Sequence, residues 1–257
     1  MRKWTAGLVA TAMTLTGMLL AGVSPAAAVQ VAQDQVVSDN PVGFTPHVLD
    51  GEVDSIAQVG NLIILGGSFT RVRSAADATE IARRNLVAFD ATTGVISETF
   101  NPSPDGAVTT VIPSADGTSV YVGGAFNTIS GQTRRKVAQV SVTTGANVVG
   151  FRNVAANGKV TDLRLVGNRL WVAGAFTSIA ATARPALVTL NATTGAYDPY
   201  MSLTVQGVHN GGTTTVAKID VTPDGSRLVA IGNFDNVSGT AGHQAFMLDL
   251  TGPAAAM

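Results

Sequence analysis

The stretch VYVGGAFNTISG, residues 120–131, decides how this sequence is read, because its β-branched run and its Gly-Ala-Phe ending recur elsewhere in the chain. Related segments are IILGGSF at residues 63–69, WVAGAF at 171–176 and VAIGNF at 229–234. Their phenylalanines lie 57, 50 and 58 residues apart and are Phe69, Phe126, Phe176 and Phe234. Self-similarity at such a spacing is the signature of a repeat architecture.

Two further markers accompany each phenylalanine in the same order. A segment of the form Val-x-x-apolar precedes it, at residues 53–56, 108–111, 160–163 and 216–219. A turn spelled FDATTG, VSVTTG, LNATTG or LDLTG follows it and ends at Gly94, Gly145, Gly195 and Gly252. The sequence therefore predicts repeats at about residues 51–104, 105–156, 157–205 and 213–257.

Each repeat has the pattern of four short strands. Apolar residues alternate in segments such as KVTDLRLV at 159–166, which is typical of a strand. Turn sequences such as ADG at 115–117 and PDG at 223–225 supply residues that tolerate positive φ. Four antiparallel strands in about 40 to 50 residues are typical of a propeller blade. We predict an all-β fold, a β-propeller of about four four-stranded blades, as either a small closed ring or a partial arc of a larger propeller.

The Gly-small-Phe motif has a structural interpretation in such a fold. Glycine or alanine before the phenylalanine would let neighbouring blades approach, and the ring would fill the gap between them. A glycine-rich phosphate site would need a helix after the motif, and NTISG at 127–131 does not begin one.

The N-terminus, residues 1–28, has the pattern of a secretory signal peptide. Arg2 and Lys3 precede an apolar stretch, and small residues lead to a predicted cleavage between Ala28 and Val29. After cleavage, 14 Lys and Arg face 17 Asp and Glu, a net charge of −3, which does not favour a nucleic-acid partner. No later segment has transmembrane length, so we expect a secreted or cell-surface protein with no membrane span.

Residues 29–50 are expected to form an N-terminal segment that could supply a closing strand to the last blade of the propeller. VGFTP at 42–46 is similar to TFNP at 99–102, the end of the first repeat, whereas the last repeat stops at TGPAAAM without a fourth strand. A strand from residues 29–50 could complete that last blade. Without it, an open arc would expose apolar faces at both ends.

At this point the residues resemble a family. VYVGGAFNTISGQTRRKVAQVSVTTG and LWVAGAFTSIAATARPALVTLNATTG look like the delta-60 type β-propeller repeats of secreted bacterial proteins. The resemblance covers about residues 51–252 and implies the β-propeller fold. Repeats of this family usually occur in longer extracellular proteins, beside carbohydrate-binding or immunoglobulin-like domains. It implies no catalytic residue. An arginine before the third strand recurs in three repeats, as Arg83, Arg134 and Arg184, and is expected to bridge strand ends; the fourth repeat has His243 nearby instead.

Candidate chemistry is sparse. The chain has no cysteine, and His47, His209 and His243 form no i, i+4 pair, so we predict no metal site, no cofactor and no catalytic residue. Asp90, Asp105, Asp116 and Asp224 lie in or beside turns, where carboxylates cap main-chain amides.

The connection VQGVHNGGTTT at 205–215 interrupts the repeat, and makes His209 and Asn210 the candidates for a binding loop. An insertion without a ligand remains the alternative.

The sequence favours an exported, non-enzymatic scaffold, the N-terminal part of a longer protein, that binds a surface protein or glycan; it does not indicate an oligomeric state. The alternative is an extracellular hydrolase or lyase acting on polysaccharide, with some catalytic groups outside this chain. Substitution of His209 and Asp162 would separate the two hypotheses, because only the enzyme would lose turnover.

Overall fold

The computed structural model describes residues 42–75 and 78–257. None of these residues is helical, so the described chain is all-β, and within it no helix has the length and apolar character of a membrane span. The predicted signal peptide, its cleavage between Ala28 and Val29, and residues 29–41 lie outside the described residues.

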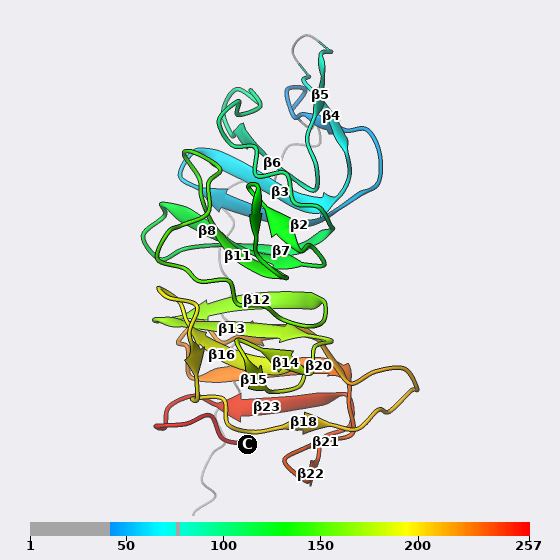
Figure 1. The fold of residues 1–257 in the computed structure, drawn as a ribbon, viewed down its shortest axis with the longest axis vertical. Coiled ribbons are helices and arrows are strands. Elements are labelled where there is room, and N and C mark those ends of the chain that lie inside the picture. Colours follow the sequence, from blue (N-terminus) through cyan, green and yellow to red (C-terminus); the bar gives the residue numbers. More distant parts are fainter. Residues whose placement is uncertain (1–41, 76–77) are drawn as a thin grey trace, which may run out of the picture. The chain divides into compact units, whose positions relative to one another are not determined.

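Four antiparallel sheets follow one another in sequence order (Figure 1). The first contains β2 (Glu52–Val59), β3 (Leu62–Ser68) and β6 (Leu86–Asp90). The second contains β7 (Val108–Pro113), β8 (Ser119–Gly124) and β11 (Val137–Ser141). The third contains β12 (Val160–Val166), β13 (Arg169–Gly174), β16 (Leu187–Asn191) and β17 (Tyr197–Asp198). The fourth contains β19 (Thr215–Val221), β20 (Arg227–Asn233) and β23 (Ala245–Asp249).

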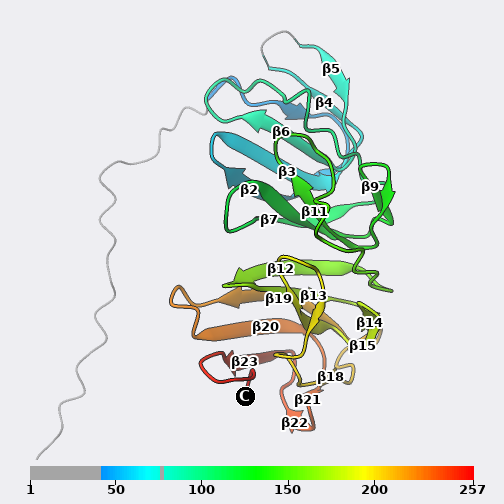
Figure 2. The same ribbon diagram turned by 60° about the vertical axis from the view of Figure 1, so that its left-hand side comes forward.

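A short hairpin interrupts each repeat between its second and third main strands (Figure 2). The hairpins are β4 (Arg71–Arg73) with β5 (Glu80–Ala82), β9 (Thr128–Ile129) with β10 (Gln132–Thr133), β14 (Ser178–Ile179) with β15 (Thr182–Ala183), and β21 (Asn236–Val237) with β22 (Thr240–Ala241). In the first and fourth repeats a preceding strand adds to the hairpin: β1 (His47–Val48) pairs with β4, and β18 (Val205–Gln206) pairs with β21.

The fourth strand of each predicted blade is mostly reduced to one bridge. Only the third sheet has it as a strand, β17. The other sheets have single antiparallel bridges, Phe89 to Ile96, Val140 to Asn147 and Asp249 to Ala256. The prediction of four strands per blade is therefore confirmed for the third sheet. In the other three sheets the fourth strand is only a single bridge.

The N-terminal segment lies beside the first sheet instead of completing the fourth. A Cβ built on Gly94 would meet the Phe44 carbonyl oxygen at 1.9 Å, so Phe44 lies against the turn of the first repeat. The fourth sheet obtains its last bridge from its own continuation, because Ala256 pairs with Asp249. For the described residues 42–50, the expected closure of the last blade is therefore not what the structure shows.

The Val-x-x-apolar marker proves to be a β-bulge present in all four sheets. The pairing register shifts between Val53 and Ser55, and at the matching places in β7, β12 and β19. The bulge residues are Asp54, Thr109, Thr161 and Ala217. A bulge changes the direction of its side chain, so these four residues depart from the alternation of side chains between the two faces of a strand. Together they line a groove along the inner strands.

The glycine of the Gly-small-Phe motif acts inside its own sheet. A Cβ on Gly124 would meet the Ala107 carbonyl oxygen at 2.1 Å, and Gly67, Gly174 and Gly232 are equally close to their own inner strands. The contact with the next sheet is made one residue earlier, where Gly123 faces Val160 and Leu163. The prediction that the motif glycine lets neighbouring blades approach is therefore wrong for Gly124. Gly123, the residue before it, allows the close approach of the next sheet.

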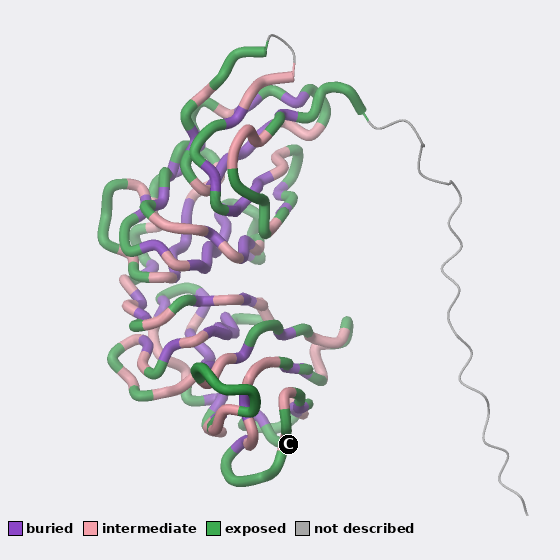
Figure 3. Tube along the Cα trace, turned by 90° about the vertical axis from the view of Figure 1, so that its right-hand side faces the viewer, coloured by how far each residue is buried: buried purple, intermediate pink, exposed green. Residues whose placement is uncertain are grey.

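Three of the four motif phenylalanine rings fill the spaces between sheets. Phe126, Phe176 and Phe234 are fully or almost fully buried, each in an apolar cluster shared with the preceding sheet. Phe69 is buried in a cluster of the first repeat alone. Figure 3 shows buried segments running through the sheets and exposed residues concentrated in the connections. The core is therefore a series of layers between neighbouring sheets, the arrangement of propeller blades.

Both ends of this series are open. In the first sheet Val53 and Ile56 are 39% and 68% exposed, and in the fourth Val229 and Ile231 are 43% and 49% exposed. A closed ring of four would bury these side chains against one another. In the described residues, therefore, neighbouring sheets do not cover these two faces.

Candidate functional site

The loop that precedes β19 is the candidate site, and it departs from the other repeats. In the first three repeats, Asp50, Asp105 and Asn157 at this place each accept two main-chain N–H groups that follow the repeat phenylalanine. A glycine follows each of these caps, which completes a compact turn. The fourth repeat replaces the turn by the longer segment 207–214, in which Gly207, Gly211 and Gly212 adopt φ of 81°, 72° and 82°.

Asn233 holds this loop to the fourth sheet. Its Oδ1 accepts the main-chain N–H groups of His209 at 3.1 Å and Asn210 at 3.0 Å. Its Nδ2 donates to the carbonyl of Gly211 at 2.7 Å. The two residues predicted to form a binding loop are therefore fixed at the main chain. The sequence carried a signal for this anchor, since Asn233 occupies the small position of the motif that is Ser68, Ala125 and Ala175 in the other repeats.

The loop brings His209 to two side chains that the sequence analysis did not join to it. His209 Nδ1 lies 3.0 Å from Asp235 Oδ1, and His243 Nδ1 lies 3.4 Å from the same oxygen. The two imidazole rings have centroids 5.3 Å apart. The hydrogen bond from His209, supported by that from His243, lowers the pKa of the Asp235 carboxyl. Because the histidines are 34 residues apart in sequence, only the fold could reveal the cluster.

The three side chains can hold a metal ion. Their ligand atoms all lie within 4.8 Å of one another, and no second group of this kind was found among residues 42–75 and 78–257. The side chains of His209, Asp235 and His243 are 41%, 38% and 62% exposed. The prediction of no metal site used the absence of an i, i+4 histidine pair, and the fold brings His209 and His243 together without such a pair. His47 is in β1 of the first repeat and does not belong to the cluster.

The repeating arginines contact the main chain to different extents. Arg83 donates to the Ser97 carbonyl at 3.1 Å, and Arg184 donates to the Ser202 carbonyl at 2.9 Å. Both link the end of the hairpin to the segment after the turn. Arg134 donates to the carbonyl of the preceding residue, Thr133, at 3.3 Å, and this bond does not link the hairpin to the segment after the turn. The fourth repeat has Gly242 at this place, whose N–H donates to the Asp235 carbonyl at 3.1 Å.

The aspartates in turns cap main-chain amides, as predicted. Asp90, Asp105, Asp116 and Asp224 all accept main-chain N–H groups of nearby residues. Hydrogen bonds from the Thr222 hydroxyl, then from Ser226, lower the pKa of Asp224 to about 2. These carboxylates stabilise the turns.

Asp162, which the enzyme hypothesis singled out, is committed to the fold. It is 2% exposed, and its two oxygens accept the main-chain N–H groups of Leu163 and Ile219, each at 3.0 Å. Arg164 pairs with it at 2.8 Å. Trp171 is likewise structural: it is fully buried between the third and fourth sheets, edge-on to Tyr200 at 6.1 Å.

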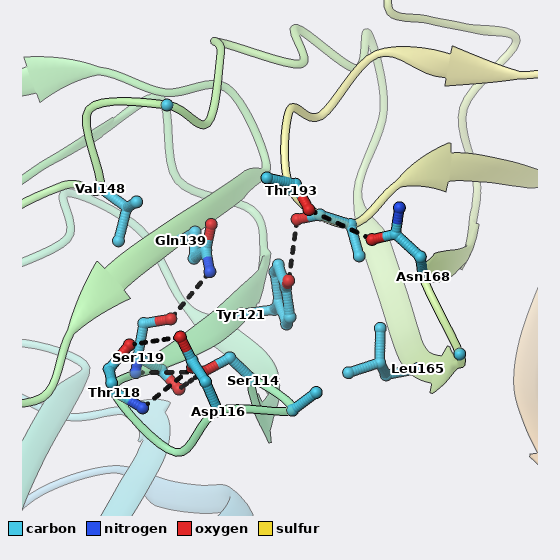
Figure 4. A pocket seen from close by; sticks show the side chains of 14 residues that line it. Ser114, Asp116, Thr118, Ser119, Tyr121, Gln139, Val148, Leu165, Asn168 and Thr193 are labelled. Carbon is cyan, nitrogen blue, oxygen red and sulfur yellow. Dashed lines mark hydrogen bonds between the residues drawn. The ribbon is translucent and has the colours of Figure 1, made fainter.

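A half-open cavity of about 330 Å³ lies between the second and third sheets, where the sequence analysis placed no site. Tyr121 donates across it to the Ala192 carbonyl at 2.8 Å. Gln139 Nε2 donates to the Ser119 hydroxyl at 2.8 Å, and the buried Gln139 Oε1 has no protein partner (Figure 4).

No protein-family model matches the sequence, and no curated protein matches it either. Among solved structures, the computationally designed Ika4 protein is similar with a TM-score of 0.44 and 14% identity, over 76% of this chain and 94% of that chain. The β-propeller domain of Cps50 (Swd1) from Myceliophteria thermophila is similar with a TM-score of 0.47 and 10% identity, over 80% of this chain. A chain of the mitotic checkpoint complex is similar with a TM-score of 0.47 and 16% identity, over 88% of this chain. The sequence spans 54% and 62% of the latter two chains.

Proposed function

We propose that the mature chain is an exported, non-enzymatic β-propeller scaffold, the N-terminal part of a longer extracellular protein that binds a surface protein or glycan through its loops. The observation that carries the longer protein is the open face of the fourth sheet. Val229, Ile231 and Met247 on this face are 43%, 49% and 50% exposed. Adjacent exposed apolar side chains mark a surface that a protein partner covers.

The other repeats indicate what covers this face. Val229 pairs with Met247 across β20 and β23. The matching pairs in the preceding sheets are Ile64 with Ala88, Tyr121 with Gln139, and Trp171 with Thr189, and all six residues are buried. Each of these pairs is covered by the next sheet of the series. The occupant we propose for the open face is therefore a further sheet of the same repeat, carried by the same polypeptide.

The first experiment is the intact mass of the product that the native host secretes. A mass well above the 26.2 kDa of the printed sequence supports the further sheet in the same polypeptide. A mass at or below that value contradicts it. Sedimentation of the purified chain then serves as a second measurement, since a stable dimer blocked by Ile231→Thr would make a second copy the occupant.

Loop binding is tested separately, with cell-envelope polysaccharide and envelope proteins of the host as probes. We expect the purified chain to bind one of them, and Asn210→Ala to weaken this binding. Gln132→Ala, an exposed change in the hairpin of the second repeat, is the matched control and leaves it unchanged. Equal binding by both variants would contradict the loop assignment. Release of new reducing ends from the polysaccharide would contradict the non-enzymatic assignment.

A further inference from the structure

We propose that His209, Asp235 and His243 bind a divalent transition-metal ion such as zinc. Two imidazole nitrogens and a carboxylate oxygen form a three-ligand set of the kind that leaves a fourth position to water or to a partner group. The site goes beyond the scaffold function and does not depend on it.

Two of the three ligand separations already fit such an ion, and the third is within 4.8 Å. Ligand bonds of about 2.0–2.1 Å in a tetrahedral site place neighbouring ligand atoms about 3.3 Å apart. The two separations from Asp235 Oδ1 are 3.0 Å to His209 Nδ1 and 3.4 Å to His243 Nδ1. Both nitrogens already face the same carboxylate oxygen. An ion can therefore replace the two hydrogen bonds by three ligand bonds when each neutral imidazole carries its proton on Nε2 and Nδ1 offers its lone pair.

Hydrogen bonds of the main chain hold the segment of each ligand in place. Asn233 holds the N–H of His209, as described above. The N–H of Asp235 donates to the Gln206 carbonyl at 3.0 Å. His243 follows Gly242, whose N–H donates back to the Asp235 carbonyl at 3.1 Å. The three ligands therefore come from the loop, the end of β20 and the end of the last hairpin, and the fold holds them together.

The site is confined to one repeat. At the places of Asp235 and His243, the second repeat has Asn127 and Arg135, and the third has Thr177 and Pro185. The main-chain bond to the carbonyl of the repeat phenylalanine is nevertheless made in all three, and its donors are the N–H groups of Lys136, Ala186 and Gln244. The ligands of the fourth repeat are thus additions to the repeat and not part of what folds it.

The donor types select the ion. Imidazole suits zinc, copper and nickel, whereas calcium and magnesium take oxygen ligands almost exclusively. With two nitrogens among three donors, we expect zinc to bind and calcium and magnesium not to compete at millimolar concentration. Copper(II) should bind at least as tightly as zinc, as the general order of affinities requires.

The test is a titration of the purified full chain, treated with a chelator and free of any histidine-containing tag. Calorimetry with Zn²⁺ should give one ion per chain, and Co²⁺ should give the visible absorption of a four-coordinate nitrogen and oxygen site. His209→Ala, His243→Ala and Asp235→Asn should each weaken Zn²⁺ binding at least about tenfold. Saturating Zn²⁺ should raise the Tm of the parent chain, because it binds the folded state alone, and leave the Tm of these variants unchanged.

Two controls keep the test decisive. His47→Ala removes the histidine outside the cluster and should leave stoichiometry and affinity unchanged. Asn233→Ala leaves all three ligands but frees the loop, and should weaken binding about tenfold through positioning alone. His243 is 62% exposed, so its substitution does not threaten folding. Absence of binding by the parent chain, or equal affinity in the parent and the His243→Ala and His209→Ala variants, would overturn the proposal.

Discussion

The hydroxyl of Thr109 donates a hydrogen bond of 2.6 Å to the main-chain carbonyl of Val160, which belongs to the next sheet. One repeat later, Thr161 donates to the Val216 carbonyl at 2.6 Å. Both donors are bulge residues of their inner strands. The bulge therefore does more than end the regular pairing: it aims a hydroxyl at the neighbouring sheet and ties successive sheets together.

Removal of this hydroxyl should measurably loosen the contact between sheets. We expect Thr109→Val to lower the free energy of unfolding by about 1 kcal/mol, because the Val160 carbonyl loses a donor while the volume is preserved. Thr109→Ser keeps the hydroxyl and is the control. Urea denaturation followed by the fluorescence of the buried Trp171 measures the effect. Equal stability of the two variants would show that the bond contributes nothing.

The motif glycine should not tolerate a side chain. Gly124→Ala places a Cβ about 2 Å from the Ala107 carbonyl oxygen, so β7 must move, and we expect a loss of about 2–4 kcal/mol. Gly150→Ala is the matched control, because its nearest neighbour would be the Thr193 carbonyl oxygen at 3.9 Å. It should change stability by less than about 0.5 kcal/mol. A similar loss in both variants would contradict the assigned role.

Stability should fall in acid partly through Asp50. Hydrogen bonds from the Thr70 hydroxyl, then from the N–H groups of Thr70 and Arg71, lower its pKa from 3.8 to about 2. Because the unfolded chain binds this proton more readily, the contribution is present above pH 3.8 and is lost as the pH falls through about 2. Asp50→Asn keeps an acceptor, as Asn157 does in the third repeat, and removes the titration.

The urea midpoint at several pH values between 5 and about 2 tests this linkage. We expect the midpoint of Asp50→Asn to fall less steeply with acid than that of the parent. Asp50→Ala removes the cap itself and should be less stable at every pH. Parallel pH profiles for the parent and Asp50→Asn would rule out the carboxylate as a source of acid sensitivity.

The open face of the fourth sheet should tolerate polar residues in this chain but not in the secreted protein. Ile231→Thr with Met247→Thr should change the stability of the 257-residue chain by less than about 0.5 kcal/mol, since both side chains are half-exposed. Leu248→Ala on the buried face should cost about 2–5 kcal/mol. If a further sheet covers the face in the longer protein, the same double substitution lowers the Tm there. An unchanged Tm in the longer protein would contradict the covering.

The repeat pattern predicted the strands well because it reflects contacts that recur. Phe126 and Phe176 recur at the spacing of the motif, and each ring packs between its own sheet and the preceding one. The fourth strands were harder to predict. Their residues make one bridge each in three sheets, and a single bridge leaves little periodicity in the sequence. The position of Phe44 beside Gly94 was also beyond the pattern, because similarity to another strand end does not say which sheet a segment joins.

The sequence by itself determined that the described part of this chain is all-β, that it contains four related sheets, and that His209 and Asn210 lie in a loop foreign to the repeat. These properties follow from local alternation, turn chemistry and repetition, which neighbouring residues encode. Only the tertiary structure decided that His209 and His243 share Asp235, that Asp162 is buried beneath Ile219, and that the faces of the first and last sheets stay open. Each depends on which distant segments the packed sheets bring into contact, and no local pattern in the chain specifies that.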